Sequence, residues 1–304
     1  MSLEHNLVFG ANSFLGTELI KVLKEQNRNV VGTTRRKSAV SDNCVYLDLS
    51  EDDLNFNISQ SVNYAYLLAG IWNYGECETD PNAWKVNVVN MARFAKQLLE
   101  QGVFVTFIST NTVFGGERPW CHEDDEHKPL FPYAQHKSAA ESAIQAVAKE
   151  LDVIDKLNIV RLTKILGIRT APLPSWIDTM ERGDVLRPFA DLSFAPTSVR
   201  YTAESLAEIG RHHIPGNLHV SGADNVSYDE FSRKFADSLG FKTIEIEPTT
   251  SVKMNVNIPF KPRYSGIGME RTTKLIGLKP QTLDELMVDL AAQYKLIKSE
   301  SSSV

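Results

Sequence analysis

Short apolar segments alternate with amphipathic segments through the first half of the 304-residue chain, and few folds accommodate that rhythm. The apolar segments predict strands, and the segments whose apolar residues recur at helical spacing predict helices. Strands that alternate with helices are typical of a parallel sheet with helices on both faces. The sequence therefore predicts a doubly wound α/β fold. The expected strands are 7–9, 29–32, 44–49, 64–68, 103–109 and 157–163, and the expected helices are 14–25, 81–101 and 132–150.

The rhythm changes after Gly167, where several prolines interrupt regular elements. Further along, the pattern predicts a helix over 228–239, a strand over 243–246 and a final helix over 283–294. Ligands of open α/β sheets bind at the carboxyl ends of the strands, and a second lobe there would close a cleft. We expect a first domain of residues 1–166 joined by parts of 198–225, a smaller lobe of residues 167–297, and a disordered tail of residues 298–304.

Composition and charge exclude several classes of protein. Apolar residues make up 42% of the chain, which is enough for a packed core, and no segment is long and apolar enough to span a membrane. The 32 basic residues are outnumbered by 38 acidic ones, so the basic excess that binds nucleic acid is missing. Three unpaired cysteines predict free thiols in a reducing cytoplasm. The N-terminal residues have no basic region, so we expect no cleaved signal peptide.

A glycine-containing turn joins the first expected strand to the first expected helix. A tight turn at a helix N-terminus presents backbone N–H groups and a partial positive charge to a diphosphate. Gly10 would allow the sharp turn, Gly16 would allow close packing, and Ser13 stands where a middle glycine is usual. The turn predicts a dinucleotide site, and an ordinary strand-to-helix turn is the alternative. Its residues are Gly10, Ala11, Asn12, Ser13, Phe14, Leu15 and Gly16.

Basic residues follow the second expected strand, where a site that prefers NAD usually has an acidic residue. Arg35 and Arg36 stand there instead. Guanidinium groups bind phosphate through paired hydrogen bonds, so this run favours NADP(H) over NAD(H), and a solvated basic turn is the alternative. Two more segments are expected beside the cofactor, one near the adenine edge and one near the ribose and phosphates: Asp48-Leu49 and Leu68-Ala69-Gly70.

A tyrosine and a lysine lie one turn apart at the start of the expected helix 132–150. Tyr133 and Lys137 share a helical face, and a nearby ammonium would lower the pKa of the tyrosine. Such a tyrosine can donate or accept a proton near neutral pH. Thr110 ends the preceding strand, and its hydroxyl could bind the same substrate oxygen. The alternative for the tyrosine and lysine is an ordinary amphipathic helix pair.

The order of these motifs resembles that of the extended short-chain dehydrogenases/reductases, in particular their dTDP-4-dehydrorhamnose reductase-like, sugar-nucleotide-modifying branch. The resemblance covers about residues 4–295. Besides the segments above, it rests on Val86-Asn87, Ser109-Thr110, Val113-Phe114-Gly115, Glu123, Asp125, Pro129, Tyr133 with Lys137, residues 160–163, residues 219–222 with Ser227 and Phe231, and residues 275–280.

The resemblance implies a Rossmann-type domain that binds NADP and a C-terminal substrate-binding lobe. It implies an oxidoreductase that reduces the keto group of a nucleotide-linked 4-keto-6-deoxy sugar. Tyr133 would be the general acid, Lys137 would hold the nicotinamide ribose and lower the tyrosine pKa, and Thr110 would hold the substrate oxygen. Asn87 would be a structural or relay residue. The residues expected at the cofactor are Gly10, Asn12, Ser13, Phe14, Leu15, Gly16, Arg35, Arg36, Asp48, Leu49, Leu68, Ala69, Gly70, Tyr133 and Lys137.

Other interpretations stay open at this point. A nucleotide-sugar epimerase or a non-catalytic NADP-binding regulatory subunit could use the same scaffold. Trp72, Asn111 and Trp176 are candidates for substrate binding, with packing in a core as the alternative for the tryptophans. The run 121–127 is rich in His, Asp and Glu but lacks regular ligand spacing, so no metal site is predicted. The helices expected over 81–101 and 132–150 could pair in a homodimer.

Overall fold

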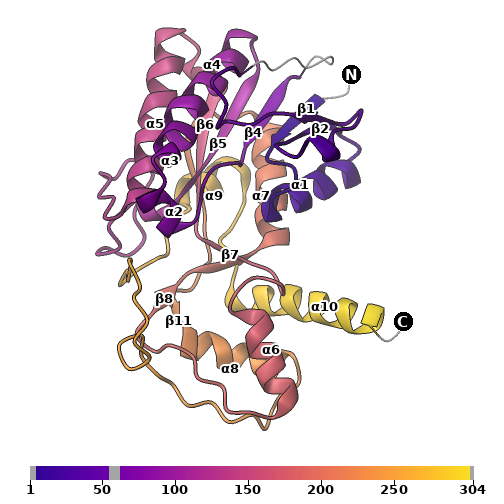
Figure 1. The fold of residues 1–304 in the computed structure, drawn as a ribbon, viewed down its shortest axis with the longest axis vertical. Coiled ribbons are helices and arrows are strands. Elements are labelled where there is room, and N and C mark those ends of the chain that lie inside the picture. The colour runs from indigo at the N-terminus through magenta and orange to yellow at the C-terminus, as the bar shows by residue number, and fades with distance from the viewer. Residues whose placement is uncertain (1–4, 55–61, 302–304) are drawn as a thin grey trace.

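A seven-stranded parallel sheet forms the centre of the molecule (Figure 1). The computed structural model describes residues 5–54 and 62–301. The strand order is β10-β6-β5-β4-β1-β2-β3, and every neighbouring pair is parallel. The strands are β1 (His5–Phe9), β2 (Asn29–Thr34), β3 (Cys44–Tyr46), β4 (Tyr64–Leu67), β5 (Phe104–Thr110), β6 (Leu157–Leu162) and β10 (Gly216–Val220).

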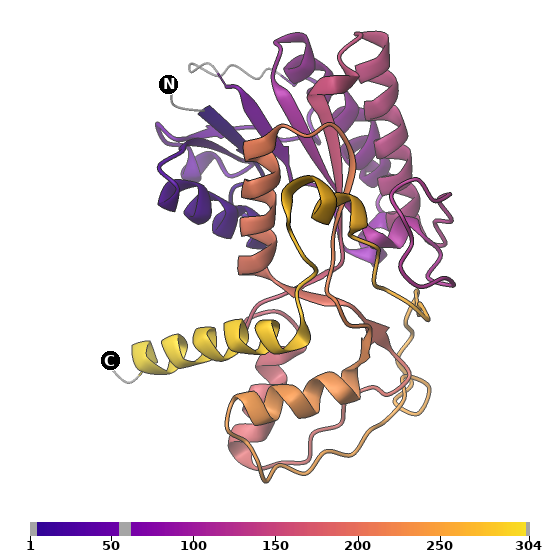
Figure 2. The ribbon, with the colours of Figure 1, turned by 180° about the vertical axis from the view of Figure 1, so that it is seen from behind.

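Helices cover both faces of this sheet, as the views from front and back show (Figures 1 and 2). On one face α1 (Phe14–Glu25) and α7 (Val199–His212) pack on alternate strand residues such as Ile108. On the other face α4 (Met91–Glu100) and α5 (Pro132–Glu150) pack on their neighbours such as Phe107. The predicted doubly wound fold is therefore confirmed.

The long helix predicted over 81–101 is helical but not uniform. It consists of α3 (Asn82–Trp84), a π-helical stretch (Lys85–Asn90) and α4. Short 3₁₀ turns occur at Lys37–Ala39, Asn111–Val113 and Ile154–Lys156. A further short helix, α2 (Tyr74–Thr79), follows β4 and was not expected from the sequence.

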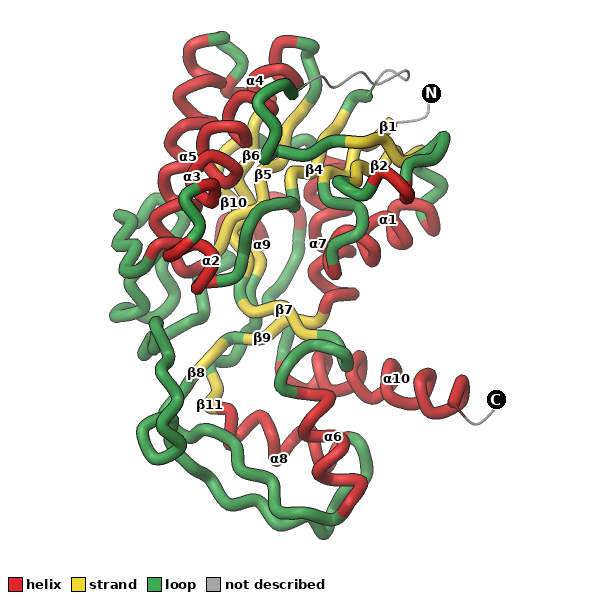
Figure 3. The backbone as a smooth tube through the Cα atoms, viewed as in Figure 1, coloured by secondary structure: helices red, strands yellow, loops and turns green. Residues whose placement is uncertain are grey.

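A second set of elements lies beyond the carboxyl ends of the strands (Figure 3). Its apolar core joins the helices α6 (Leu173–Arg182), α8 (Tyr228–Ser238) and α10 (Leu283–Ser301). Two small strand pairs connect it to the sheet: β7 (Lys164–Leu166) with β9 (Pro196–Ser198), and β8 (Ser193–Phe194) with β11 (Val226–Ser227). Helix α9 (Glu270–Ile276) returns to the sheet, where Thr272 bonds to the backbone of His219 in β10.

Two expectations for this region are wrong. The alternating residues 243–246 do not form a strand but make a single bridge, from Ile246 to Leu186. Residues 298–301, expected in a disordered tail, continue helix α10, and residues 302–304 lie outside the described part of the chain. The division of the chain into domains at residue 166 stays a prediction. No helix of the described segments is long and apolar enough to cross a membrane.

Candidate active site

The glycine turn between β1 and α1 is built as tightly as the sequence predicts. Ser13 caps α1 by accepting a hydrogen bond from Gly16 N at 3.0 Å. Gly10 has a φ of +95°, which side chains with a Cβ rarely adopt. A Cβ on Gly10 would come within 3.0 Å of the Cβ of Ala69, and one on Gly16 would overlap the carbonyl oxygen of Gly10. Both glycines are therefore required by the turn itself.

The end of β2 holds this turn in place. Thr33 Oγ1 accepts from Gly10 N at 3.1 Å, and Asn12 Nδ2 donates to Thr34 Oγ1 at 2.7 Å. Thr34 also accepts from the backbone N–H of Arg36, so the basic residues begin directly beside the turn. Both Arg35 and Arg36 are exposed, and none of the ion pairs found among the described residues involves either side chain. Their guanidinium groups are thus available to an anion.

The segments expected near the adenine and ribose lie along the same sheet edge. Asp48 accepts a hydrogen bond from Ser50 N, and Leu49 is buried. Gly70, which ends the segment after β4, is exposed, and a Cβ there would come within 2.9 Å of Asn87 Oδ1. Asn87 clamps the next residue, because it accepts from Ile71 N at 2.8 Å and donates to Ile71 O at 2.9 Å. Asn87 Nδ2 also lies 3.4 Å from His136 Nδ1, so the choice between a structural and a relay role stays a prediction.

These features fit a dinucleotide. A helix N-terminus, a glycine cradle with no room for a Cβ, and exposed guanidinium groups suit a diphosphate and a further phosphate. Two predicted cofactor residues contribute differently from the rest. Leu15 packs into the core and can offer only its backbone, whereas Phe14 is exposed and lies against Gly167.

Lys137 lies beneath the end of β5. Its Nζ donates to the carbonyl oxygen of Ile108 at 2.8 Å and sits 4.7 Å from the centre of the Phe107 ring. Thr110 is two residues further along the same strand, and its Oγ1 accepts from Thr112 N at 3.2 Å. The structure thus brings the predicted lysine to the strand end that carries the predicted threonine. Tyr133 is one turn earlier on the helix of Lys137.

Tyr133 lies among aromatic rings. The ring of Tyr74, from α2, is centred 5.5 Å from it, and that of Phe131 is 6.3 Å away. Phe260, from the C-terminal half of the chain, packs on Phe131 at 5.0 Å. Burial raises the pKa of Tyr133, with smaller contributions from Tyr74 and Cys77. The lowering of this pKa expected from Lys137 is not found, because the pKa is raised and desolvation is the largest cause.

Lys137 itself responds to the same burial. Desolvation lowers its pKa to about 8, and the carboxylate of Glu141, one turn further along α5, acts in the opposite direction. A lysine poised in this way can lose or keep its proton within the physiological range. Its charge therefore depends on its neighbours.

Behind Lys137 lies a buried polar network that the sequence analysis missed. Arg161, in β6, binds Glu141 through Nε and Nη2, the latter 2.7 Å from Oε2, and Ser109 Oγ donates to Oε1 of the same carboxylate. Arg161 also donates to Glu123 O at 2.9 Å, to His127 Nε2 at 2.9 Å and to His219 Nε2 at 3.3 Å. Arg161 is a charged residue within an apolar strand, and this signal could have revealed the network.

Both histidines of this network are held as neutral acceptors. His219 Nδ1 donates to Gly268 O at 2.8 Å, so Nε2 accepts from Arg161. Burial and the charge of Arg161 lower the pKa of His219 to about 3. Burial likewise lowers the pKa of His127, whose Nδ1 bonds to Ser138. Of the groups that bond to Arg161, Glu141 is thus the one that carries a negative charge.

The three candidates for substrate binding have different positions. Asn111 donates to Ser265 O at 2.8 Å and so ties the end of β5 to the C-terminal half. Trp72 is 75% exposed beside the site. Trp176 is 8% exposed and packs on Tyr228 and Phe231 in the core of the lobe, which makes it unavailable to stack on a ligand.

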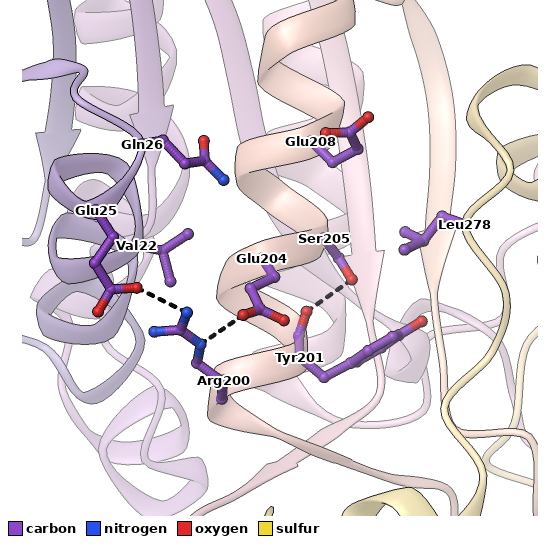
Figure 4. A pocket seen from close by; sticks show the side chains of 9 residues that line it. All are labelled: Val22, Glu25, Gln26, Arg200, Tyr201, Glu204, Ser205, Glu208 and Leu278. Atoms are coloured by element: carbon purple, nitrogen blue, oxygen red, sulfur yellow. Dashed lines mark hydrogen bonds and ion pairs between the residues drawn. The ribbon is translucent and has the colours of Figure 1, made fainter.

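Two other features remain. Within the run 121–127, Glu123 and His127 belong to the network of Arg161, whereas Asp124 pairs with Arg271 and Asp125 accepts a hydrogen bond from His122 N. A groove between α1 and α7 contains none of the predicted site residues, and its Arg200 is bound by Glu25 at 2.7 Å and Glu204 at 2.6 Å (Figure 4). The arginine of this groove is thus already paired with two carboxylates.

Comparison with known proteins agrees with this architecture. The chain is 25% identical over 299 residues to a probable low-salt glycan biosynthesis reductase of Haloferax volcanii, covering 94% of this chain and 97% of that protein. It is 26% identical over 271 residues to a dTDP-4-keto-6-deoxy-D-glucose reductase of Streptomyces niveus, covering 86% and 88%.

Solved structures share the fold over nearly the full length. A dTDP-4-dehydrorhamnose reductase of Clostridium acetobutylicum superposes with a TM-score of 0.80 at 23% identity, covering 97% of this chain and 99% of that one. A UDP-N-acetylglucosamine 4-epimerase of Methanobrevibacter ruminantium gives 0.81 at 17% identity, covering 99% and 100%. The reductase of Bacillus anthracis, solved with NADP, gives 0.78 at 20% identity, covering 95% and 98%.

The sequence also matches a protein-family model over almost its whole length. The model described as the RmlD substrate binding domain matches residues 4–296, which is almost the whole chain. The match confirms the resemblance stated from the motifs. The protein belongs to the RmlD substrate-binding domain family.

Proposed function

We propose that the protein is an NADP-dependent reductase of a keto group on a nucleotide-linked sugar, with a 4-keto-6-deoxy sugar as the substrate class. Support comes from the relatives named as reductases and from the combination of Thr110, Tyr133 and Lys137 at one end of β5 and α5. The observation that carries the proposal is the buried ammonium of Lys137 on Ile108 O, two residues from Thr110 and one turn from Tyr133.

In this proposal Thr110, Tyr133 and Lys137 each have a separate role in the reduction. A reduced nicotinamide supplies hydride to the carbonyl carbon when it is bound. Tyr133 then donates its phenolic proton to the carbonyl oxygen, and Thr110 holds that oxygen by a hydrogen bond. The raised pKa of Tyr133 keeps the phenol protonated before the reaction, which suits a proton donor. Lys137 supplies a positive charge that favours the phenolate formed in the reaction.

The preference for NADP is part of this proposal. Arg35 and Arg36 are exposed beside the turn that holds Gly10, and a 2′-phosphate would provide their anion. The Bacillus anthracis reductase was solved with NADP, which is consistent with this preference.

The test is oxidation of NADPH, followed by absorbance, against a panel of nucleotide-linked 4-keto sugars. We expect turnover on at least one member, and we expect Tyr133→Phe to slow it by about 100- to 10,000-fold while leaving NADPH affinity nearly unchanged. Tyr294→Phe is the control, because this tyrosine lies on α10 and bonds to Glu181, away from the site. An unchanged rate in Tyr133→Phe would remove this residue from the mechanism.

An epimerase is the second candidate, because an epimerase structure superposes over the whole chain. An epimerase oxidises and re-reduces its sugar, so the cofactor would stay bound and no net NADPH would be consumed. Conversion of one nucleotide sugar into its epimer, with cofactor retained through purification, would favour this function over the reductase.

A further inference from the structure

A buried carboxylate lies one helical turn beyond Lys137 on α5. Glu141 is 1% exposed and accepts hydrogen bonds from two strands of the sheet. We propose that Glu141 is a positioning residue of the candidate active site, which fixes the end of β5 and keeps the Lys137 ammonium charged and in place. The inference rests on the proposed function for the role of Lys137, and its test is chosen so that the two can fail separately.

Two contacts from consecutive turns of α5 fasten the end of β5. Lys137 Nζ donates to Ile108 O at 2.8 Å, and Ser109 Oγ donates to Glu141 Oε1. Thr110 is the next residue of the strand. The lysine and the glutamate therefore fix the backbone next to Thr110, the residue proposed to hold the substrate oxygen.

Arg161 holds Glu141 from the other side. Its Nη2 lies 2.7 Å from Oε2 and its Nε lies 3.1 Å from Oε1, while both side chains are almost fully buried. A paired, bidentate arrangement of this kind fixes the orientation of a carboxylate. Arg161 comes from β6 and Ser109 from β5, so the Glu141 carboxylate of α5 binds both strands.

The other groups that the described residues place against Lys137 carry no full negative charge. From β5 it meets the Ile108 carbonyl and the Phe107 ring, and from α2 it faces the Cys77 thiol. Burial raises the pKa of that thiol, so it stays protonated near neutral pH. Among the described residues that act on the charge of Lys137, Glu141 is the one carboxylate. It is therefore the group that opposes the desolvation of the ammonium.

The first test measures the charge of Lys137 directly and needs no substrate. Protein containing lysine labelled with a heavy carbon isotope at Cε is titrated by NMR, and the Lys137 signal is assigned by its loss in Lys137→Arg. In Glu141→Gln we expect the midpoint of the Lys137 titration to fall by about one pH unit or more. Glu150→Gln is the matched control, because Glu150 ends the same helix, is 68% exposed and pairs with Lys96 on the surface. A midpoint unchanged in Glu141→Gln overturns the inference, whatever the protein catalyses.

A kinetic test separates positioning from simple support of the fold. If NADPH-linked turnover is found, the alkaline limb of its pH profile should move to lower pH in Glu141→Gln by the same amount as the titration. Glu141→Asp keeps the carboxylate and should restore most of the midpoint. A loss of rate in Glu141→Gln with no shift in either pH measurement would show a structural role alone and overturn the inference.

Glu141→Gln could unfold the protein, because it leaves the Arg161 charge buried without a counter-charge. The double variant Glu141→Gln/Arg161→Met removes both charges together. Because this variant also lacks the carboxylate one turn from Lys137 on α5, the Lys137 midpoint should still fall in the double variant. A double variant that folds and keeps the wild-type midpoint also overturns the inference.

Discussion

Replacing Gly10 with alanine should damage the cofactor turn more than its backbone strain alone explains. Gly10 has a φ of +95°, and holding a residue with a Cβ in this region costs about 1–2 kcal/mol. The added Cβ would also lie 3.0 Å from the Cβ of Ala69 and 3.1 Å from its backbone nitrogen. Overpacking of this kind adds about 1–3 kcal/mol, so the total loss of stability should be about 2–5 kcal/mol.

Gly216 offers a matched control. Its φ is +93°, nearly the same as that of Gly10, but a Cβ there would meet nothing within 4 Å. Gly216→Ala should therefore lose only the stability that the strained backbone conformation costs, about 1–2 kcal/mol. For a chain of this size each kcal/mol corresponds to a shift of about 2–4 °C in melting temperature, so the two variants should be distinguishable by calorimetry.

NADPH affinity should separate the variants further. In Gly10→Ala the turn must move away from Ala69 and strain the hydrogen bond from Gly10 N to Thr33 Oγ1. A loss of about 1.4 kcal/mol in cofactor binding is a tenfold rise in Kd, and we expect at least that in Gly10→Ala and none in Gly216→Ala. Equal melting temperatures in the two variants, together with unchanged NADPH affinity, would refute the reasoning about this turn.

Three more predictions address cofactor choice, the buried ion pair and pH. Arg35→Ala/Arg36→Ala should raise the Kd for NADPH about tenfold or more and leave that for NADH nearly unchanged by fluorescence titration; an equal loss for both would refute the 2′-phosphate argument. Arg161→Met should lower the free energy of unfolding, measured in urea, by about 3–5 kcal/mol, because it leaves the buried Glu141 carboxylate without its arginine partner. Arg187→Met breaks the exposed pair with Glu247 and should lower the free energy of unfolding by about 1 kcal/mol or less. The folded protein holds the pKa of His219 at about 3, below its ordinary 6.5, so the unfolded chain binds the extra proton and stability should fall as pH drops from 6.5 toward 3. His219→Gln should flatten this fall by up to about 1.4 kcal/mol per pH unit in urea titrations, and the exposed His212→Gln should not.

Local patterns sufficed for much of the sheet and its helices. Helix α1 begins after the capping Ser13 and ends at Glu25, as predicted, because both its apolar face and its cap are encoded within a few residues. Helix α5 begins at Pro132 for a similar reason, since proline suits a first helical turn. The bounds of these two helices could be predicted because they are determined by residues within or next to each helix.

Prediction failed where a pattern depends on distant partners. Residues 243–246 alternate like a strand, yet only Ile246 finds a bridge, to Leu186, so no ladder forms. Helix α2 is short, and its Cys77 is buried against Ile71 and Asn87. The local sequence pattern does not predict these contacts, so the helix was not expected.

In the candidate site, too, the features that depend on local sequence could be predicted and those that depend on distant contacts could not. The spacing of Tyr133 and Lys137 and the place of Thr110 could be predicted, because they depend on one helix and one strand end. The pKa of Tyr133 could not, since it depends on burial, and one of the rings beside Tyr133, that of Tyr74, comes from α2. The pairing of Glu141 with Arg161 needs α5 and β6 to be packed together.

The edge strand β10 has a consequence for how the protein can be made and divided. It pairs with β6, from Gly216–Asn158 to Val220–Leu162, although more than fifty residues of other structure separate the two strands in the chain. During synthesis, the backbone N–H and C=O groups of β6 that pair with β10 lack this partner until β10 has left the ribosome. A fragment cut at residue 166 would keep that edge open permanently, and open edges of this kind recruit strands from other molecules. A fragment that keeps the whole sheet would therefore have to join residues 198–225, with α7 and β10, to residues 1–166.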